Sequence, residues 1–205
     1  MKDKVHWLGH ASFRIDGENA TVYIDPWKLG AKPPEADLVL ITHGHYDHFS
    51  ADDIAKVAGS HTMLVGPADV TAQYKGASVT IKPGESKTVG GVHIEAVAAY
   101  NVGKKFHPKA NDWLGYVVTV DGTRYYHTGD SDATDELMGA RADVVLVPVG
   151  GTYTMTADEA AEAVNAIGPK LAVPMHWGDI VGSDGDARRF AELCDCEVLI
   201  LTPEN

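Results

Sequence analysis

Short runs of alternating apolar and polar residues, separated by turn residues, occupy most of the first two thirds of the chain and predict β-strands. Strands of this kind are predicted at residues 5–8, 12–15, 21–24, 79–81, 87–89, 92–98, 113–120 and 123–127. Asp121-Gly122 is typical of a tight hairpin turn, and we expect these strands to pair antiparallel with their neighbours.

Continuous apolar runs predict further strands that are buried, and helix signals lie between them. These strands are predicted at residues 38–41, 62–65, 143–147, 171–174 and 197–201. Helices are predicted at residues 51–58, 67–74, 132–138, 157–167 and 186–193. Ser50 is a favourable N-cap for the first helix, which we expect Gly59 to end, and Thr156 with Glu159 forms a capping box.

Strands are followed by helices in each half of the chain. Two facing sheets with helices outside, an α/β fold of four layers in the order αββα, accommodate this order. The length of 205 residues suits one domain, which we expect to span residues 1–205.

Composition and charge narrow the class of partner. With 17 basic and 29 acidic residues, the net charge of −12 repels phosphate backbones, so we expect no nucleic-acid partner. Bound divalent ions would invert that sign locally, which leaves a small anionic substrate open. No apolar run is long enough to span a membrane, and no signal peptide is visible. Cys194 and Cys196 are the only cysteines, and we expect packing thiols in a reducing, cytoplasmic compartment.

The stretch Thr42-His43-Gly44-His45-Tyr46-Asp47-His48 follows the buried strand at residues 38–41 directly. His43 and His45 are two residues apart and can present imidazoles to one point, while Asp47 and His48 can face a second point on the turn. Imidazole and carboxylate groups are ligands for zinc and similar divalent ions. The alternative is a polar loop with surface histidines, which this density of ligands disfavours.

These residues match the H-x-H-x-D-H signature of the metallo-β-lactamase-fold hydrolases, which the chain resembles over nearly its whole length. Gly-His-Ala-Ser, Tyr-His-Thr-Gly-Asp and Pro-Met-His-Trp make it most similar to small stand-alone members such as L-ascorbate-6-phosphate lactonase. The resemblance implies two metal sites: His43, His45 and His107 at site one, Asp47, His48 and His176 at site two, and Asp130 bridging them. His93 competes with His107 for its position, but it lies within an alternating strand and is expected at the surface.

Three further residues are candidates for supporting roles. His10, in Gly9-His10-Ala11, either lies at the edge of the core or supports the metal centre and substrate. Asp25 either caps a turn or orients a metal-binding histidine through its other ring nitrogen. Tyr153 follows an apolar strand and either forms a turn or contacts substrate, whereas His127 is expected to be structural or to support the ligands.

The resemblance implies a metal-dependent hydrolase in which a hydroxide between two ions attacks an ester, lactone or phosphodiester of a small molecule, with Asp47 and Asp130 as catalytic residues. Zinc is the expected metal, and the carboxylates leave manganese and iron open. The alternatives are an iron-dependent redox protein of the same fold and a metal-binding protein without catalysis. Neither the substrate nor the oligomeric state follows from the sequence, and a homo-oligomer remains open.

Overall fold

Two β-sheets lie face to face in the computed structural model, which describes residues 1–204. The first sheet has the strand order β1-β2-β3-β4-β5-β6. Its strands are β1 (Val5–Gly9), β2 (Ser12–Asp16), β3 (Thr21–Ile24), β4 (Ala36–Leu40), β5 (Ala58–Gly66) and β6 (Ser78–Thr80). The strands from β1 to β3 pair antiparallel with their neighbours, and those from β3 to β6 pair parallel.

The second sheet contains the remaining strands in the order β13-β12-β11-β10-β9-β8-β7. They are β7 (Ser86–Val89), β8 (Val92–Ala98), β9 (Leu114–Val120), β10 (Thr123–His127), β11 (Val144–Pro148), β12 (Leu171–Met175) and β13 (Glu197–Val198). The strands from β7 to β10 pair antiparallel, and those from β10 to β13 pair parallel. The expected hairpin at Asp121-Gly122 therefore joins β9 to β10.

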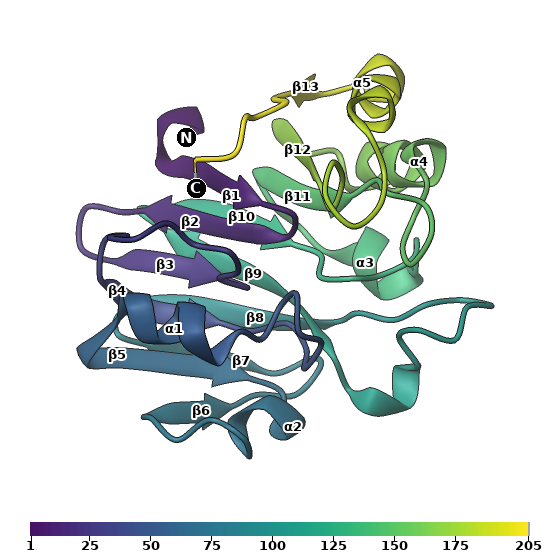
Figure 1. Cartoon of the computed structure of the whole chain (residues 1–205). Coiled ribbons are helices and arrows are strands. Elements are labelled where there is room, and N and C mark those ends of the chain that lie inside the picture. Colours follow the sequence, from purple (N-terminus) through teal and green to yellow (C-terminus); the bar gives the residue numbers. More distant parts are fainter. Residues whose placement is uncertain (205) are drawn as a thin grey trace.

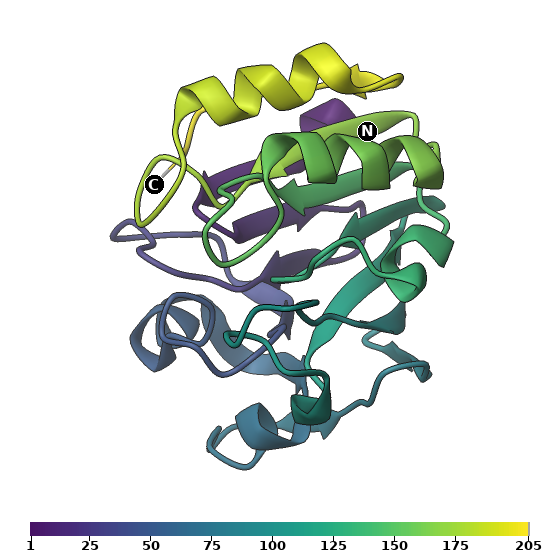
Figure 2. The same cartoon turned by 90° about the vertical axis from the view of Figure 1, so that its right-hand side faces the viewer.

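Helices cover the outer face of each sheet, as Figures 1 and 2 show. The helices are α1 (Ala51–Val57), α2 (Ala68–Thr71), α3 (Asp135–Gly139), α4 (Ala157–Ile167) and α5 (Asp184–Leu193), with short 3-10 turns at Lys2–Lys4 and Lys109–Asn111. Ile54 of α1 and Val70 of α2 pack on the first sheet, whereas α4 and α5 pack on the second. No helix within residues 1–204 has the length and apolar character needed to cross a membrane.

Three apolar clusters separate the layers and account for the fold. The largest fills the space between the sheets and includes Phe13, Leu40, Tyr116 and Leu146. The other two lie between each sheet and its helices. β11 is buried along its whole length because it has a neighbouring layer on both faces, as its continuous apolar sequence predicted. The four-layer αββα arrangement is confirmed.

Some predicted boundaries and one strand direction are wrong. Gly59 does not end α1: Ala58 is the C-cap, and β5 begins there because Ala58 already pairs with Ala36 of β4. β6 is parallel to β5, not antiparallel, since α2 carries the chain back along the sheet before β6 begins. Alternation of apolar residues indicates a strand with one buried face, but it does not specify which neighbour the strand pairs with.

Other helix and strand limits differ by a few residues. α3 begins at Asp135 instead of residue 132, because the Thr134 side chain caps it by accepting from the N–H of Leu137. α5 likewise begins at Asp184, two residues earlier than expected, with Ser183 as its N-cap. β13 ends at Val198 and so is shorter than the predicted strand. Cys194 and Cys196 are free thiols that pack against the cluster beneath α4, as expected.

Candidate metal centre

The candidate site residues follow the carboxyl ends of strands from both sheets. The first sheet supplies His10 after β1, Asp25 after β3, and the His43–His48 stretch after β4. The second supplies His107 after β8, Asp130 after β10, Tyr153 after β11 and His176 after β12. Strand ends of the two sheets meet here, where the N–H of Leu114 donates to the carbonyl of Thr42.

Potential ligand atoms converge in three overlapping groups, and within each group they lie within 4.8 Å of one another. The groups are His43, His45 and His107; His10, Asp47, His48 and His176; and His43, His48 and Asp130. The first matches the predicted site one, and the second contains the predicted site two together with His10. His43 Nε2 and His45 Nδ1 are 3.0 Å apart, close to the roughly 3.4 Å that separates two nitrogens on one tetrahedral zinc ion.

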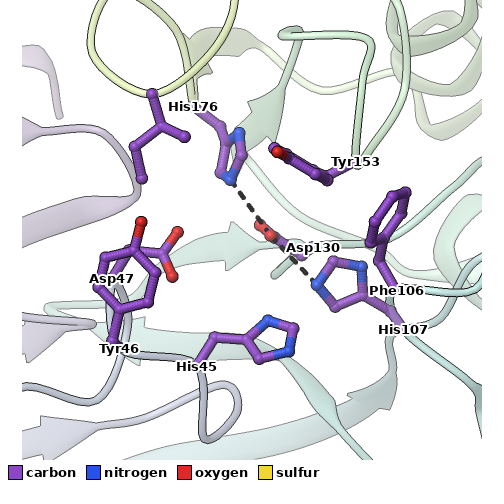
Figure 3. A pocket seen from close by; sticks show the side chains of 9 residues that line it. His45, Tyr46, Asp47, Phe106, His107, Asp130, Tyr153 and His176 are labelled. Atoms are coloured by element: carbon purple, nitrogen blue, oxygen red, sulfur yellow. Dashed lines mark ion pairs between the residues drawn. The ribbon is translucent and has the colours of Figure 1, made fainter.

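Asp130 lies between the two predicted sites. Its Oδ2 is 3.3 Å from Nε2 of His107, 3.2 Å from Nε2 of His176 and 3.4 Å from Nε2 of His48. Figure 3 shows His107 and His176 pointing at this carboxylate from two sides. The turn that carries Asp130 requires a glycine at position 129. The φ of Gly129 is +62°, and a Cβ there would lie 2.5 Å from the carbonyl oxygen of Leu114.

Three histidines have their ring orientation and tautomer fixed by buried partners. His48 Nδ1 donates to Asp25 over 2.7 Å, and His107 Nδ1 donates to Asn101 over 3.1 Å. The Thr42 hydroxyl donates its single hydrogen to Asp25, so it accepts from His43 Nδ1 over 2.9 Å. In the neutral form of each ring Nε2 is therefore left with a lone pair, which is the form that binds a metal.

A cation accounts for atoms that otherwise have no partner. Buried side-chain atoms without a hydrogen bond include Nε2 of His48, His107 and His176 and Oδ1 of Asp130. Buried polar atoms are normally paired, and when the rings are neutral, lone pairs of nitrogen and carboxylate oxygen that face each other at 3.2–3.4 Å repel. The donor set of imidazoles and carboxylates and these orphaned atoms together fit divalent ions.

Burial and charge shift several pKa values in this cluster. Burial lowers the pKa of His43 well below its usual range, aided by the charge of His48, so His43 stays a neutral ligand. Burial alone would raise the pKa of Asp130, but His176 and His48 hold it well below its usual range. Burial opposes ionisation of Asp47 as well, yet its hydrogen bond from His10 and the charge of His48 bring its pKa to about 2.

His48 shows the opposite shift. Burial would lower its pKa, but the carboxylates of Asp130 and Asp25 raise it well above its usual range. The same carboxylates attract a divalent ion, which would compete with the proton on His48. Metal binding and protonation are thus alternatives at this ring.

Asp25, His10 and His127 each make buried hydrogen bonds beside the candidate ligands. Asp25 is fully buried and accepts from Thr42 and His48, so it orients a histidine instead of only capping a turn. His10 donates from Nε2 to Oδ2 of Asp47 over 3.0 Å. His127 accepts from the N–H of Gly129 through Nδ1 and donates to the carbonyl of Ala11, which makes it structural.

His10, Asp25 and His176 all have positive φ, between 47° and 59°, a conformation rare outside glycine and found at functional sites.

Thr42 and Asn101 were not predicted, although Thr42 adjoins the histidine motif and Asn101 lies on the same loop as His107. Their roles depend on contacts that only the folded chain creates.

The predicted site residues are thus brought together, and His93 is not. His93 lies on β8, exposed, and pairs across the sheet with Thr119. Tyr153 is half-buried and lines a cavity of about 250 Å³ over the cluster, together with Tyr46 and Phe106 (Figure 3).

Comparison with known proteins places this site in a family. The model of the β-lactamase superfamily domain matches residues 4–176. The chain belongs to the β-lactamase superfamily. Within the superfamily it is 33% identical to a UPF0173 metal-dependent hydrolase of Archaeoglobus fulgidus, covering 98% of this chain and 96% of that one, and 36% identical, with the same coverage, to one of Thermococcus onnurineus.

Solved structures agree with this superfamily assignment. A crystal structure from Parabacteroides distasonis matches with a TM-score of 0.86 and 30% identity, covering 96% of this chain and 91% of that chain. A metallo hydrolase from Ignicoccus hospitalis matches with a TM-score of 0.78 at 22% identity, covering 98% and 95%, and supports the fold alone. This member of the β-lactamase superfamily is therefore one of its metal-dependent hydrolases. The narrower likeness to L-ascorbate-6-phosphate lactonase stays a prediction.

Proposed function

We propose that this chain hydrolyses an ester, lactone or phosphodiester bond of a small molecule with the help of two bound divalent metal ions. The observation that carries the proposal is the convergence of unpartnered, buried Nε2 atoms of His48, His107 and His176 on one oxygen of Asp130. Such an arrangement is costly without a cation and favourable with one.

The proposed ligands divide into two sets that share a carboxylate. His43, His45 and His107 would hold one ion, Asp47, His48 and His176 the other, and Asp130 would bridge them. Ions bound here would lower the pKa of water and polarise the bond under attack. Zinc fits the imidazole-rich set best, and manganese or iron fits the carboxylates.

The chain's own side chains would orient this chemistry. Asp25, Thr42 and Asn101 hold three imidazoles in the binding tautomer. Asp47, ionised at neutral pH because its pKa is about 2, is an acceptor on the cavity wall and is held by His10. We assign Asp47 and Asp130 to the catalytic machinery as acceptors that position water, and not as proton donors.

The test compares two histidine variants for metal content and hydrolysis together. We expect His45→Ala to lose metal and hydrolytic activity in parallel, because it removes a ligand but leaves the fold's core untouched. His93→Ala is the matched control: it removes an exposed histidine from β8 and should change neither quantity. Hydrolysis by protein freed of metal, or full activity of His45→Ala, would contradict the proposal.

A further inference from the structure

The cavity over the candidate metal centre has walls of two kinds. Part of its lining consists of the candidate ligands themselves, and the rest consists of Tyr46, Phe106, Tyr153 and Ile180. Three of those four carry aromatic rings. At about 250 Å³ the cavity is at the small end of ligand pockets, and one apolar group of modest size fits it.

Two of these rings are unusually exposed. Tyr46 is 69% exposed and Phe106 is 45% exposed, and among the described residues the only other large apolar side chains that are exposed are Met1, Val102 and Ile200. Exposed apolar side chains that lie together on a protein surface often mark a binding site. Both rings lie at the mouth of the same cavity, so burial against a ligand would remove this surface from water.

The rings form two walls on opposite sides of the candidate ligands, as Figure 3 shows. On one side Phe106 contacts Tyr153 edge to face, with 4.7 Å between ring centroids. On the other, Tyr46 lies edge-on to Trp27 at 6.1 Å. Each contact supports the ring on its own side of the cavity, and a flat or branched apolar group can enter between the two sides.

Among the described residues, the side chains of the cavity wall offer no lysine or arginine to an anionic substituent. Lys104, on the loop that carries Phe106, is turned to Asp132 and to the carbonyl of Thr154. The chain as a whole carries a net charge of −12. Between the rings, away from the ions proposed at the candidate ligands, an anionic substituent would therefore lose its hydration without gaining an ion-pair partner from a side chain.

We propose that the substrate is an uncharged carboxylic ester or lactone whose apolar group lies between Tyr46 and the Phe106–Tyr153 pair. This inference rests on the proposed hydrolytic function and narrows it to substrates whose non-reacting part is apolar and uncharged. In the reaction, water oxygen bonds to the acyl carbon and the acyl carbon–oxygen bond breaks. The leaving oxygen takes up one proton to become an alcohol, and the new carboxylic acid releases its own proton to water.

Matched chromogenic esters test the charge preference. 4-Nitrophenyl butyrate and mono-4-nitrophenyl succinate share a leaving group and differ by a terminal carboxylate, and bis(4-nitrophenyl) phosphate offers an anionic diester. With zinc-loaded protein, we expect kcat/KM for the butyrate to exceed that of either anion by at least about tenfold. Equal or better turnover of an anionic probe would overturn the inference while leaving metal-dependent hydrolysis intact. No zinc-dependent turnover of any probe would refute the proposed function itself, and the inference with it.

Variants on one loop test the aromatic wall. We expect Phe106→Ala to raise KM for 4-nitrophenyl butyrate about tenfold while kcat changes little, because the ring binds the apolar group but does not touch the bond that breaks. Val102→Ala is the control, since Val102 is 65% exposed on the same loop and does not line the cavity. Equal KM values for the two variants, with equal zinc content, would overturn the proposed wall.

Discussion

The side-chain oxygen of Asn101 accepts two hydrogen bonds from His107, one from the ring Nδ1–H and one from the backbone N–H, each 3.1 Å long. The amide group of Asn101 donates in turn to Asp132 and to the carbonyl of Tyr153. Lys104 completes the network by donating to Asp132. One asparagine thus fixes the orientation of a candidate ligand and ties it to the loop that carries a cavity wall.

Replacing this asparagine should weaken metal binding. We expect Asn101→Leu to lower zinc affinity by about 10- to 100-fold, the usual effect of removing a partner that orients a ligand. Competition with a chromogenic chelator measures the affinity. Asn111→Leu, the same change at an exposed position nearby, should leave it unchanged. An unaltered affinity in folded Asn101→Leu would show that His107 needs no such partner.

Asp25 should matter for stability as well as for the site. It is fully buried and accepts from the N–H and hydroxyl of Thr42 and from His48. Asp25→Asn keeps the left-handed backbone accessible but turns an amide group toward these donors, and should lower the free energy of unfolding by about 2–4 kcal/mol. Urea unfolding of the metal-free protein measures this.

The control for that measurement is Asp179→Asn, which changes an exposed carboxylate paired with Lys28. Its cost should stay below about 1 kcal/mol because exposed ion pairs contribute little. Equal destabilisation by the two substitutions would mean that the buried contacts of Asp25 add nothing to folding.

Asp53 should make stability depend on pH in the acid range. Burial would raise its pKa, but hydrogen bonds from Lys56, Ser50 and two backbone N–H groups outweigh burial and hold it below the ordinary value of 3.8. A depressed folded-state pKa stabilises the fold above the ordinary value, and this contribution is lost as pH falls through the folded-state pKa.

We therefore expect Asp53→Asn to be less stable than the parent by about 1–3 kcal/mol at pH 7. The difference should shrink below pH 3.8. Asp52→Asn, an exposed neighbour in the same helical turn, should show a smaller difference at pH 7. Thermal unfolding at pH 7, 4 and 2.5 provides the comparison. A constant difference across this range would mean that Asp53 contributes through contacts alone.

Metal loading should stabilise the protein and release protons. Zinc at about 100 times its dissociation constant should add about 2.7 kcal/mol to the free energy of unfolding. Because the pKa of His48 is raised, its proton must leave when metal binds, so zinc affinity should be higher at pH 8 than at pH 6. Calorimetry in two buffers of different ionisation enthalpy counts the protons. Zinc binding without proton release would contradict the raised pKa of His48.

The features of this molecule that could be predicted from the sequence are those determined by residues close together in the chain. The spacing of His43, His45, Asp47 and His48 after an apolar run is local, so its geometry follows from the strand that precedes it. The remaining ligands His107, Asp130 and His176 needed the order of motifs in the resembling family, because no local pattern distinguishes a ligand from any other loop histidine or aspartate.

Other features depend on tertiary contacts and could not be predicted. β6 shows the same alternation that an antiparallel strand would, and only its position beside β5 sets its direction. Asn101 lies in a loop whose composition suggests nothing beyond polarity, and its role arises when Asp132 and Tyr153 are folded against it.

Because two sheets meet at the candidate metal centre, activity can be lost before the protein unfolds. The candidate ligands that follow β4 and those that follow β8, β10 and β12 belong to different sheets, so packing between the layers sets the distance between them. A slight slide of one layer over the other would separate the two sets of candidate ligands while the hydrogen bonds between strands within each sheet stayed intact. Mild denaturant should then abolish turnover at concentrations that leave the circular dichroism spectrum intact.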